Sequence, residues 1–304
     1  MTVATLSLVK LHGLGNDFLV ALDGEAFDAA SAGDPSSLVE ALCDRRTGIG
    51  ADGVVVARPA TGGGDVAMEL RNSDGGVAET SGNGLCCFAL AVLDAGAADG
   101  RRVAIETVTG TRVAELLARP ARGVAEIAVD MGTLKVARRA PVRDERLPGS
   151  IDDPWPSWSV DAGNPHLVLV APALSGVDVA AIGPSLELAR SGGQNVEIAT
   201  VGRSASEVEM VVWERGVGVT LACGTGSAAV AAALHAGGLS AATVRVANPG
   251  GTVEVSLTGD PLAPQATLTG SAQRVAQILV EPAEIGAGRQ DVKQREHEVV
   301  VTAS

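Results

Sequence analysis

Tyrosine is absent from this chain of 304 residues, which also holds only three phenylalanines and three tryptophans. The core must therefore be built from aliphatic side chains, and a hydrophobic fraction of 46% is enough for a globular fold. No run of about 18 apolar residues occurs, so no segment is expected to span a bilayer as a helix. At this length a single core is near its practical limit, and two domains are expected.

Positive charge is also scarce, because 23 basic side chains stand against 36 acidic ones and give a formal net charge of -13. No dense run of Lys or Arg is present, which argues against a nucleic-acid partner. The amino end lacks the charged and apolar segments of a signal peptide. These absences predict a soluble cytoplasmic protein that binds neither nucleic acid nor membrane.

Cysteine is scarce as well, and the four cysteines show no C-x-x-C spacing, which argues against a zinc site or a redox pair. No metal site is predicted. Free thiols in a reducing compartment fit this pattern. Cys43 and at least one of the adjacent Cys86 and Cys87 are interpreted as small core residues.

Short Val-rich runs that end in Gly, Asn or Asp clusters predict many strands and few helices. Helices are expected over Asn83–Asp94 and Thr225–His235, each after a Gly-containing turn. Gly62–Gly64 is expected at a hairpin tip, and Asp144–Ser157, with three prolines, as a linker or surface loop. The expected strands are Leu6–Lys10, Val54–Ala57, Val66–Arg71, Arg102–Glu106, Glu126–Val129, Trp158–Val160, Leu167–Val170, Val208–Trp213, Thr243–Val246 and Thr252–Leu257.

The most informative pattern is an internal repeat, in which Leu70–Gly84 is followed 142 residues later by Val212–Gly226. Both copies run from a strand through a polar pair and a Gly-rich turn into Ser or Cys-Gly-x-Gly, which opens an Ala-rich helix. Gly15–Val20 and Gly163–Val168 are a second pair of similar segments. Two homologous halves that face each other are the simplest explanation. The expected halves are 1–132 and 133–271, with the strand near 272–281 a candidate to return to the first half and 282–304 a flexible tail.

Each copy places a side chain that can carry a proton at the start of a helix, Ser81 in the first and Cys223 in the second. Unpaired N–H groups and the helix dipole favour negative charge there, so a thiol at this position is a usable base near neutral pH. The same N–H groups, approached closely at glycine, are suited to hold a carboxylate between the two helices. A substrate Cα held there would have an acid or base on each face, the geometry that inverts a stereocentre.

Such a deprotonation is usually aided by a pyridoxal Schiff base, which requires a lysine. The lysines are Lys10, Lys135 and Lys293, and none lies in a motif. A mechanism without a cofactor is therefore expected. Taken alone, Cys-Gly-Thr-Gly is more typical of a tight turn with a buried cysteine, but its repetition in register favours the catalytic interpretation.

Several segments carry a closer likeness: His12–Phe18, Asp44–Gly53, Arg71–Gly75, Ser81–Gly84, Gly163–His166, Asn195–Val196 and Trp213–Gly226. Together they resemble the diaminopimelate epimerase family, in order from about Leu6 to Val280. The resemblance implies a cofactor-independent epimerase that interconverts LL- and meso-diaminopimelate on the route to lysine and peptidoglycan. It also implies an α/β fold of the α+β type. In that fold two pseudo-symmetric domains, each a mixed, mostly antiparallel sheet wrapped round a central helix, have the site between them.

The resemblance also implies roles for the matching residues. Cys223 and Ser81 would exchange protons with the substrate Cα, aided by His166 and Glu214. Amide oxygens and Glu214 would accept from the distal ammonium group, and Arg215 would bind the distal carboxylate. Backbone N–H groups that would hold the α-carboxylate belong to Gly82, Asn83, Gly224 and Thr225. The distal end of the amino-acid substrate would be held by Asn16, Asn72, Asn164, Asn195, Glu214 and Arg215.

Ser81 departs from the family, whose members typically have cysteine at this position. A hydroxyl is a much weaker acid than a thiol, so Ser81 needs a neighbour to take its proton before it can act as a base, although it can donate. A Ser opposite a Cys resembles epimerases of hydroxylated proline in the related proline racemase-like group. Three interpretations stay open: a diaminopimelate epimerase with a Ser/Cys pair, an epimerase of another amino acid, and a non-catalytic amino-acid-binding paralogue. The retained distal-end residues favour the first.

A thiol hydrolase that uses Cys223 with His166 is the rival enzyme class, and only this class would form an acyl-thioester at Cys223. The repeat argues against it, because it offers two opposed groups rather than one nucleophile with an oxyanion hole. A homodimer is an expectation only, since Val275–Gln277 lacks the Tyr that some family members use in dimerisation.

Overall fold

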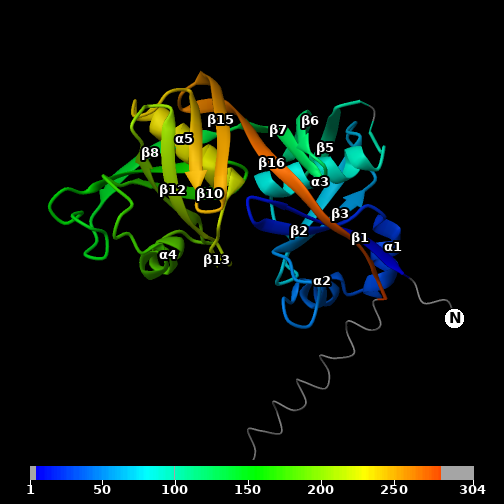
Figure 1. Cartoon of the computed structure of the whole chain (residues 1–304). Coiled ribbons are helices and arrows are strands. Elements are labelled where there is room, and N and C mark those ends of the chain that lie inside the picture. The colour runs from blue at the N-terminus through cyan, green and yellow to red at the C-terminus, as the bar shows by residue number, and fades with distance from the viewer. Residues whose placement is uncertain (1–4, 99, 282–304) are drawn as a thin grey trace, which may run out of the picture.

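The computed structural model describes residues 5–98 and 100–281, which form two curved sheets that each wrap round a helix (Figure 1). The helices of these residues are α1 (Gly24–Ser31), α2 (Pro35–Cys43), α3 (Gly82–Asp94), α4 (Val179–Glu187) and α5 (Gly224–Ala236). The strands are β1 (Leu6–Gly13), β2 (Asn16–Ala21), β3 (Gly53–Arg58), β4 (Val66–Asn72), β5 (Arg102–Thr107), β6 (Gly110–Ala121), β7 (Val124–Thr133), β8 (Lys135–Val142), β9 (Trp155–Asp161), β10 (Pro165–Val170), β11 (Asn195–Val201), β12 (Glu207–Glu214), β13 (Gly218–Val219), β14 (Thr243–Asn248), β15 (Gly251–Asp260) and β16 (Ala263–Val280).

The first sheet closes into a ring around α3. Strands β1 to β7 are neighbours in chain order, and β16 pairs with both β7 and β1. Only β2–β3 and β4–β5 are parallel pairs in this ring. The residues of α3 from Gly82 to Val92 are all buried, as expected for a helix that is apolar on every side. The crossover from β2 to β3 runs outside the ring through α1 and α2.

The second sheet repeats this plan around α5, in the order β16-β15-β14-β12-β11-β10-β9-β8. Its parallel pairs, β10–β11 and β12–β14, correspond to those of the first ring. The N–H groups of Leu134 and Val136 donate to the carbonyls of Pro264 and Leu262, each at 2.9 Å, and bring β8 back to the turn between β15 and β16. The fold predicted from the family resemblance, mixed and mostly antiparallel sheets around central helices, is confirmed.

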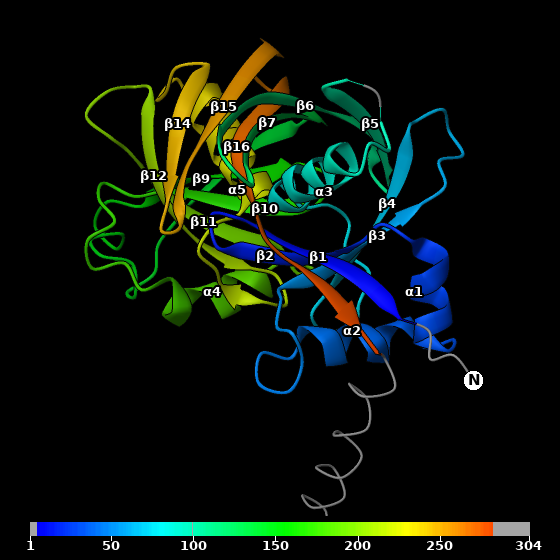
Figure 2. The ribbon, with the colours of Figure 1, turned by 45° about the vertical axis from the view of Figure 1, so that its right-hand side comes forward.

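Strand β16 belongs to both sheets. Its residues Ala263–Thr269 pair with β15, and residues Gln273–Val280 pair with β1 (Figure 2). We propose that the halves 1–132 and 133–271 follow the two sheets, with the end of β16 completing the first. The expected flexible tail, 282–304, lies outside the described residues.

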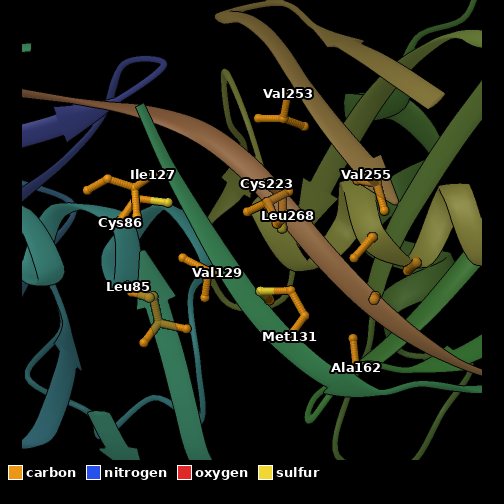
Figure 3. Packing of buried hydrophobic residues seen from close by; sticks show 14 of the residues in the cluster. Leu85, Cys86, Ile127, Val129, Met131, Ala162, Cys223, Val253, Val255 and Leu268 are labelled. Atoms are coloured by element: carbon orange, nitrogen blue, oxygen red, sulfur yellow. The ribbon is translucent and has the colours of Figure 1, made fainter. Parts of the chain in front are cut away.

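One buried cluster of side chains continues from the first sheet into the second. Figure 3 shows Leu85 from α3, Val129 from β7, Leu268 from β16 and Val255 from β15 as members of this cluster. Two smaller clusters lie under the outer helices, one beneath α1 and α2 and the other beneath α4. The ends of α3 and α5 are therefore fixed in a common core rather than in two separate ones.

Several expectations about single segments can be compared with these elements. The two predicted helices are confirmed, and each begins one residue earlier than expected. Gly62–Gly64 lies between the antiparallel strands β3 and β4, as expected for a hairpin tip. The expected loop over Asp144–Ser157 is partly wrong, because β9 begins at Trp155, whose indole is buried in the cluster beneath α4. Pro156 is tolerated in this strand because it faces a register shift in β8.

All four cysteines are free and buried, which confirms the interpretation of Cys43, Cys86 and Cys87 as core residues. Burial raises the pKa of the Cys43 and Cys86 thiols to about 12. In the described part of the chain no helix has both the length and the apolar character needed to cross a membrane.

Candidate active site

The N-terminal ends of α3 and α5 meet where the two sheets join. Gly82 and Gly224 are in direct backbone contact there. A Cβ added to Gly224 would lie 2.8 Å from the Cα of Gly82, and one added to Gly82 would lie 3.0 Å from the Cα of Gly224. Only glycine allows this approach, because any side chain at either position would collide with the opposite backbone. The two copies of the sequence repeat thus face each other at their Gly-x-Gly turns.

Ser81 and Cys223 are the N-cap residues of these two helices. The Oγ of Ser81 accepts a hydrogen bond from the N–H of Gly84 at 3.1 Å, and the Sγ of Cys223 accepts one from the N–H of Gly226 at 3.3 Å. Both caps have the extended backbone that is usual at this position. In the described chain no acceptor lies opposite the next four N–H groups, those of Gly82, Asn83, Gly224 and Thr225.

Cys223 lies beside two carboxyl groups. Glu214, at the end of β12, accepts a 2.5 Å hydrogen bond from the Thr220 hydroxyl, and its charge acts on the Cys223 thiol. Burial raises the pKa of the Cys223 thiol well above its usual value, and the charges of Glu214 and Glu197 raise it further. Burial also raises the pKa of Glu214. A thiol and a carboxyl group that both have raised pKa values in one buried site are able to pass one proton between them.

The ring of His166 lies between Glu197 and Asn164. Its Nδ1 is 2.7 Å from Oε1 of Glu197, and its Nε2 is 2.8 Å from Oδ1 of Asn164. The side chains of His166 and Glu197 are fully buried. Because both ring nitrogens are engaged, His166 has no lone pair to offer the Cys223 thiol. The thiol-hydrolase alternative therefore lacks its base.

Asn83 connects the two halves through its side chain. Its Nδ2 donates to the Oδ1 of Asn16 and to the carbonyl of Ala222, both at 3.3 Å. The Nδ2 of Asn16 in turn donates to the Oδ2 of Asp52 at 2.8 Å. The amide groups of Asn16 and Asn83 thus hold the loop before Cys223 against the first sheet. Asn72, by contrast, makes no side-chain hydrogen bond with the residues that the structure describes.

Arg215 is held from both halves. Its backbone N–H donates to the Oδ1 of Asn195 at 2.9 Å. Its Nη2 lies 2.6 Å from the Oε2 of Glu79, which precedes Ser81 by two residues. Among the predicted distal-end residues, the side chain of Asn195 therefore orients the backbone of Arg215. The guanidinium group of Arg215 is paired with a carboxylate from the opposite half.

Sequence reasoning missed Glu79 and Glu197. Glu197 is the one acidic residue in the buried strand segment Asn195–Ala199, and an acidic side chain among core residues of a strand is a signal of a special role. Glu79 offered no such signal, because its partner Arg215 lies 136 residues away in the sequence.

Comparison with known proteins identifies the family. The chain matches the family model described as diaminopimelate epimerase over residues 8–137 and 158–275. A diaminopimelate epimerase of Moorella thermoacetica is 37% identical over 240 residues, which cover 75% of this chain and 83% of that protein. A diaminopimelate epimerase of Synechocystis sp. is 35% identical over 283 residues, which cover 89% of this chain and 97% of that protein.

Solved structures show the same fold at much lower sequence identity. A hydroxyproline epimerase from Agrobacterium vitis, solved with bound trans-4-hydroxy-L-proline, has a TM-score of 0.70 at 18% identity, with 91% of each chain covered. A phenazine biosynthesis protein of the PhzF family from Bacillus anthracis has a TM-score of 0.69 at 15% identity, with 91% of this chain and 99% of that chain covered. These two likenesses concern the fold alone. The match to the family model and to the two curated relatives over most of their lengths shows that the chain belongs to the diaminopimelate epimerase family.

Proposed function

We propose that this protein is a cofactor-independent diaminopimelate epimerase that interconverts LL- and meso-2,6-diaminopimelate. The observation that carries the proposal is the meeting of two helix N-termini, with Ser81 capping one and Cys223 the other. A Cα held at this junction has a proton-carrying group on each side, as inversion requires. The choice of diaminopimelate as the substrate is based on the two curated relatives, which are both diaminopimelate epimerases.

The substrate α-carboxylate binds the four N–H groups that have no acceptor in the described chain. Two of these groups begin α3, at Gly82 and Asn83, and two begin α5, at Gly224 and Thr225. Both helix dipoles place positive partial charge at this point. When the Cα proton leaves, negative charge spreads onto the carboxylate, and the same groups stabilise it without rearrangement.

The distal end of the substrate binds on the side of Arg215. The guanidinium group forms a paired hydrogen bond with the distal carboxylate and exchanges its present partner Glu79 for it. Asn72 has a free side-chain amide, and Asn164 has a free Nδ2 group beside its bond to His166. These amides are available to the distal amino-acid group, whereas Asn16 and Asn195 position their neighbours.

Proton transfer at Cys223 involves Glu214. The thiol must lose its proton before it can act as a base, and Glu214 is a buried carboxyl group whose charge acts on this thiol. The proton passes from Sγ to the Glu214 carboxylate, and the thiolate then takes the proton from Cα. Ser81 delivers its hydroxyl proton to the opposite face and regains a proton from solvent, while Glu214 gives up the proton that it took from Cys223. Because a hydroxyl is a poor base, exchange of the Cα proton on the Ser81 face is expected to be slower than exchange on the Cys223 face.

The test is to incubate the protein with LL-diaminopimelate in deuterated water and to follow deuterium at Cα and the isomer composition. Formation of deuterated meso isomer, lost in Cys223→Ala, supports the proposal. Exchange without inversion in Ser81→Ala supports the assignment of Ser81 to the second face. Folded wild-type protein that produces neither deuterium exchange nor meso isomer would contradict the proposed function.

We further propose that the protein works in the cytoplasm as a homodimer. The buried free thiols are suited to a reducing compartment. Val275 and Leu279 on β16 are 55% and 72% exposed, an apolar surface that a second copy could cover. Light scattering after size-exclusion chromatography measures the mass, and a monomer at micromolar concentration would contradict the dimer.

A further inference from the structure

A buried pair of ionisable side chains lies behind the Cys223 half of the site. His166 and Glu197 are fully buried and 2.7 Å apart. The second carboxylate oxygen of Glu197, Oε2, is buried without a hydrogen-bond partner among the described residues. Such a pair costs free energy of desolvation, which its mutual attraction often fails to offset. A buried carboxylate that is only half satisfied calls for a reason other than stability.

The first half of the molecule shows that the fold does not require this pair. Strands β2 and β3 pair in parallel with Phe18 opposite Gly53, as β10 and β11 do with His166 opposite Asn195. Two residues further on, Val55 of β3 therefore takes the place that Glu197 has in β11. Phe18 and Val55 are buried apolar residues. The same pair of strand positions thus holds two apolar residues in the half that carries Ser81 and two ionisable residues in the half that carries Cys223.

Glu197 reaches the first turn of α5. A Cβ added to Gly226 would lie 2.6 Å from the Oε1 of Glu197 and 3.2 Å from the Sγ of Cys223. The carboxylate and the thiol therefore both border the space that a side chain at Gly226 would fill. The negative charge of Glu197 raises the pKa of the thiol, against the helix N-terminus and the hydrogen bonds from Thr225 and Gly226, which favour the thiolate.

The hydrogen bonds of His166 define what its ring is able to do. The Oδ1 of Asn164 accepts hydrogen bonds only, so the Nε2 of His166 carries a hydrogen. On the other side, Nδ1 lies 2.7 Å from the Oε1 of Glu197, which fixes the orientation of the ring. The ring therefore donates toward Asn164. A ring without Glu197 would be free to turn or to change its tautomer.

We propose that Glu197 is a positioning residue for proton transfer at Cys223. It holds His166 as a hydrogen-bond donor to Asn164, and its charge keeps Cys223 as a thiol until Glu214 takes the proton. Ser81, with apolar neighbours at the matching positions, has no such control. The catalytic part of this inference rests on the proposed function, whereas the effect on the thiol does not.

The first experiment measures the thiol without any substrate. Glu197→Gln keeps an oxygen that accepts from Nδ1 but removes the charge. Alkylation of Cys223 by iodoacetamide at pH 8, mapped by mass spectrometry, is expected to be about 3- to 10-fold faster because more of the thiol is ionised. Glu209→Gln is the matched control, since Glu209 is exposed on the neighbouring strand β12 and should leave the rate unchanged. An unchanged or slower rate in Glu197→Gln would overturn the proposal, whether or not the protein proves to be an epimerase.

The second experiment installs the first half's own apolar pair in the second half. The double variant His166→Phe with Glu197→Val should melt at or above the wild-type temperature, because an apolar pair replaces a buried charged one. Its kcat should fall by about 100-fold, with KM within about threefold, because only the proton transfer is affected. Retention of wild-type kcat would overturn the proposal. Failure of the double variant to fold would overturn it too, by showing that the pair serves the fold.

Discussion

The carboxylate of Glu79 lies 2.6 Å from the guanidinium of Arg215 and joins the loop before Ser81 to the turn before Cys223. Both side chains are partly exposed, Glu79 to 44% and Arg215 to 27%, so the pair is open to exchange with solvent ions and ligands. In the proposed function the distal carboxylate of the substrate needs the same guanidinium. Glu79 therefore competes with the distal carboxylate of the substrate for Arg215.

Glu79→Gln should strengthen substrate binding. Without the competing charge, KM for diaminopimelate is expected to fall about two- to fivefold, which corresponds to the contribution of a partly exposed ion pair. Initial-rate kinetics at low and at 0.5 M salt measure this change, and the difference should shrink at high salt. Glu115→Gln serves as the control, because Glu115 pairs with Arg102 at 3.6 Å on the surface. A rise in KM would show instead that Glu79 helps to bind the substrate.

Gly224→Ala should disrupt the junction of the two helices. The added methyl group would lie 2.8 Å from the Cα of Gly82 and 3.1 Å from the N of Asn83, and neither backbone atom can move alone. We expect a loss of about 1–3 kcal/mol in the free energy of unfolding, typical of overpacking, together with loss of epimerase activity. Urea unfolding measures the first effect. Gly270→Ala, where the nearest atom is an ordinary 3.6 Å away, is the control. Equal stability of the two variants would contradict the contact.

Ser81→Cys should make the enzyme faster. The thiol is a far stronger acid than the hydroxyl, so position 81 would then serve as a base as well as a donor. We expect kcat/KM to rise by about tenfold or more, and by the same factor in both directions because the equilibrium constant is unchanged. Rates measured in both directions, with a reductant present, test this expectation. If Ser81→Cys is no faster than the wild type in either direction, a group other than Ser81 exchanges the proton on that face.

The buried thiol of Cys86 is expected to make the free energy of unfolding depend on pH. Its folded pKa is raised to about 12 by burial, whereas the unfolded thiol titrates near its usual value. The contribution of Cys86 is therefore complete below that value and is lost as the pH rises toward 12. Each pH unit in this window costs about 1.4 kcal/mol per buried thiol.

Cys86→Ala should accordingly lose less stability than the wild type between pH 9 and pH 10. The comparison is made by urea unfolding at pH 7.5, 9 and 10, with the two proteins normalised at pH 7.5. Curves that stay parallel across this range would show that the Cys86 thiol does not remain protonated in the folded state.

The central helices were predictable from sequence because their signals are local. Ser81 and Cys223 each precede a Gly-x-Gly turn and an apolar run, so both helix starts were found within one residue. The short outer helices α1 and α4 were not predicted, because few of their residues are buried. Strand β16 was recognised only at its end, since its apolar side chains serve two different sheets along its length.

The residues of the candidate site likewise fall into those with a local sequence signal and those without one. Cys223, Ser81 and the N–H groups that follow them belong to continuous motifs, and the repeat alone placed them face to face. The pair of His166 and Glu197 depends on the parallel alignment of β10 with β11, which lies beyond any local pattern. The bond of Asn83 to Ala222 and that of Glu79 to Arg215 cross between the halves, over 139 and 136 residues. Contacts of this range become visible only in three dimensions.

Leu6 pairs with Val280, so the ring around α3 has its first and last strands at opposite ends of the described chain. During synthesis the first half emerges with β1 and β7 still lacking their shared neighbour. Its hydrophobic central helix stays open to solvent on that side until the second half has been made. While the rest of the chain is being made, this first half is an unfinished barrel with two unpaired strand edges, a feature that favours aggregation. The ring around α3 closes only once β16 has been made.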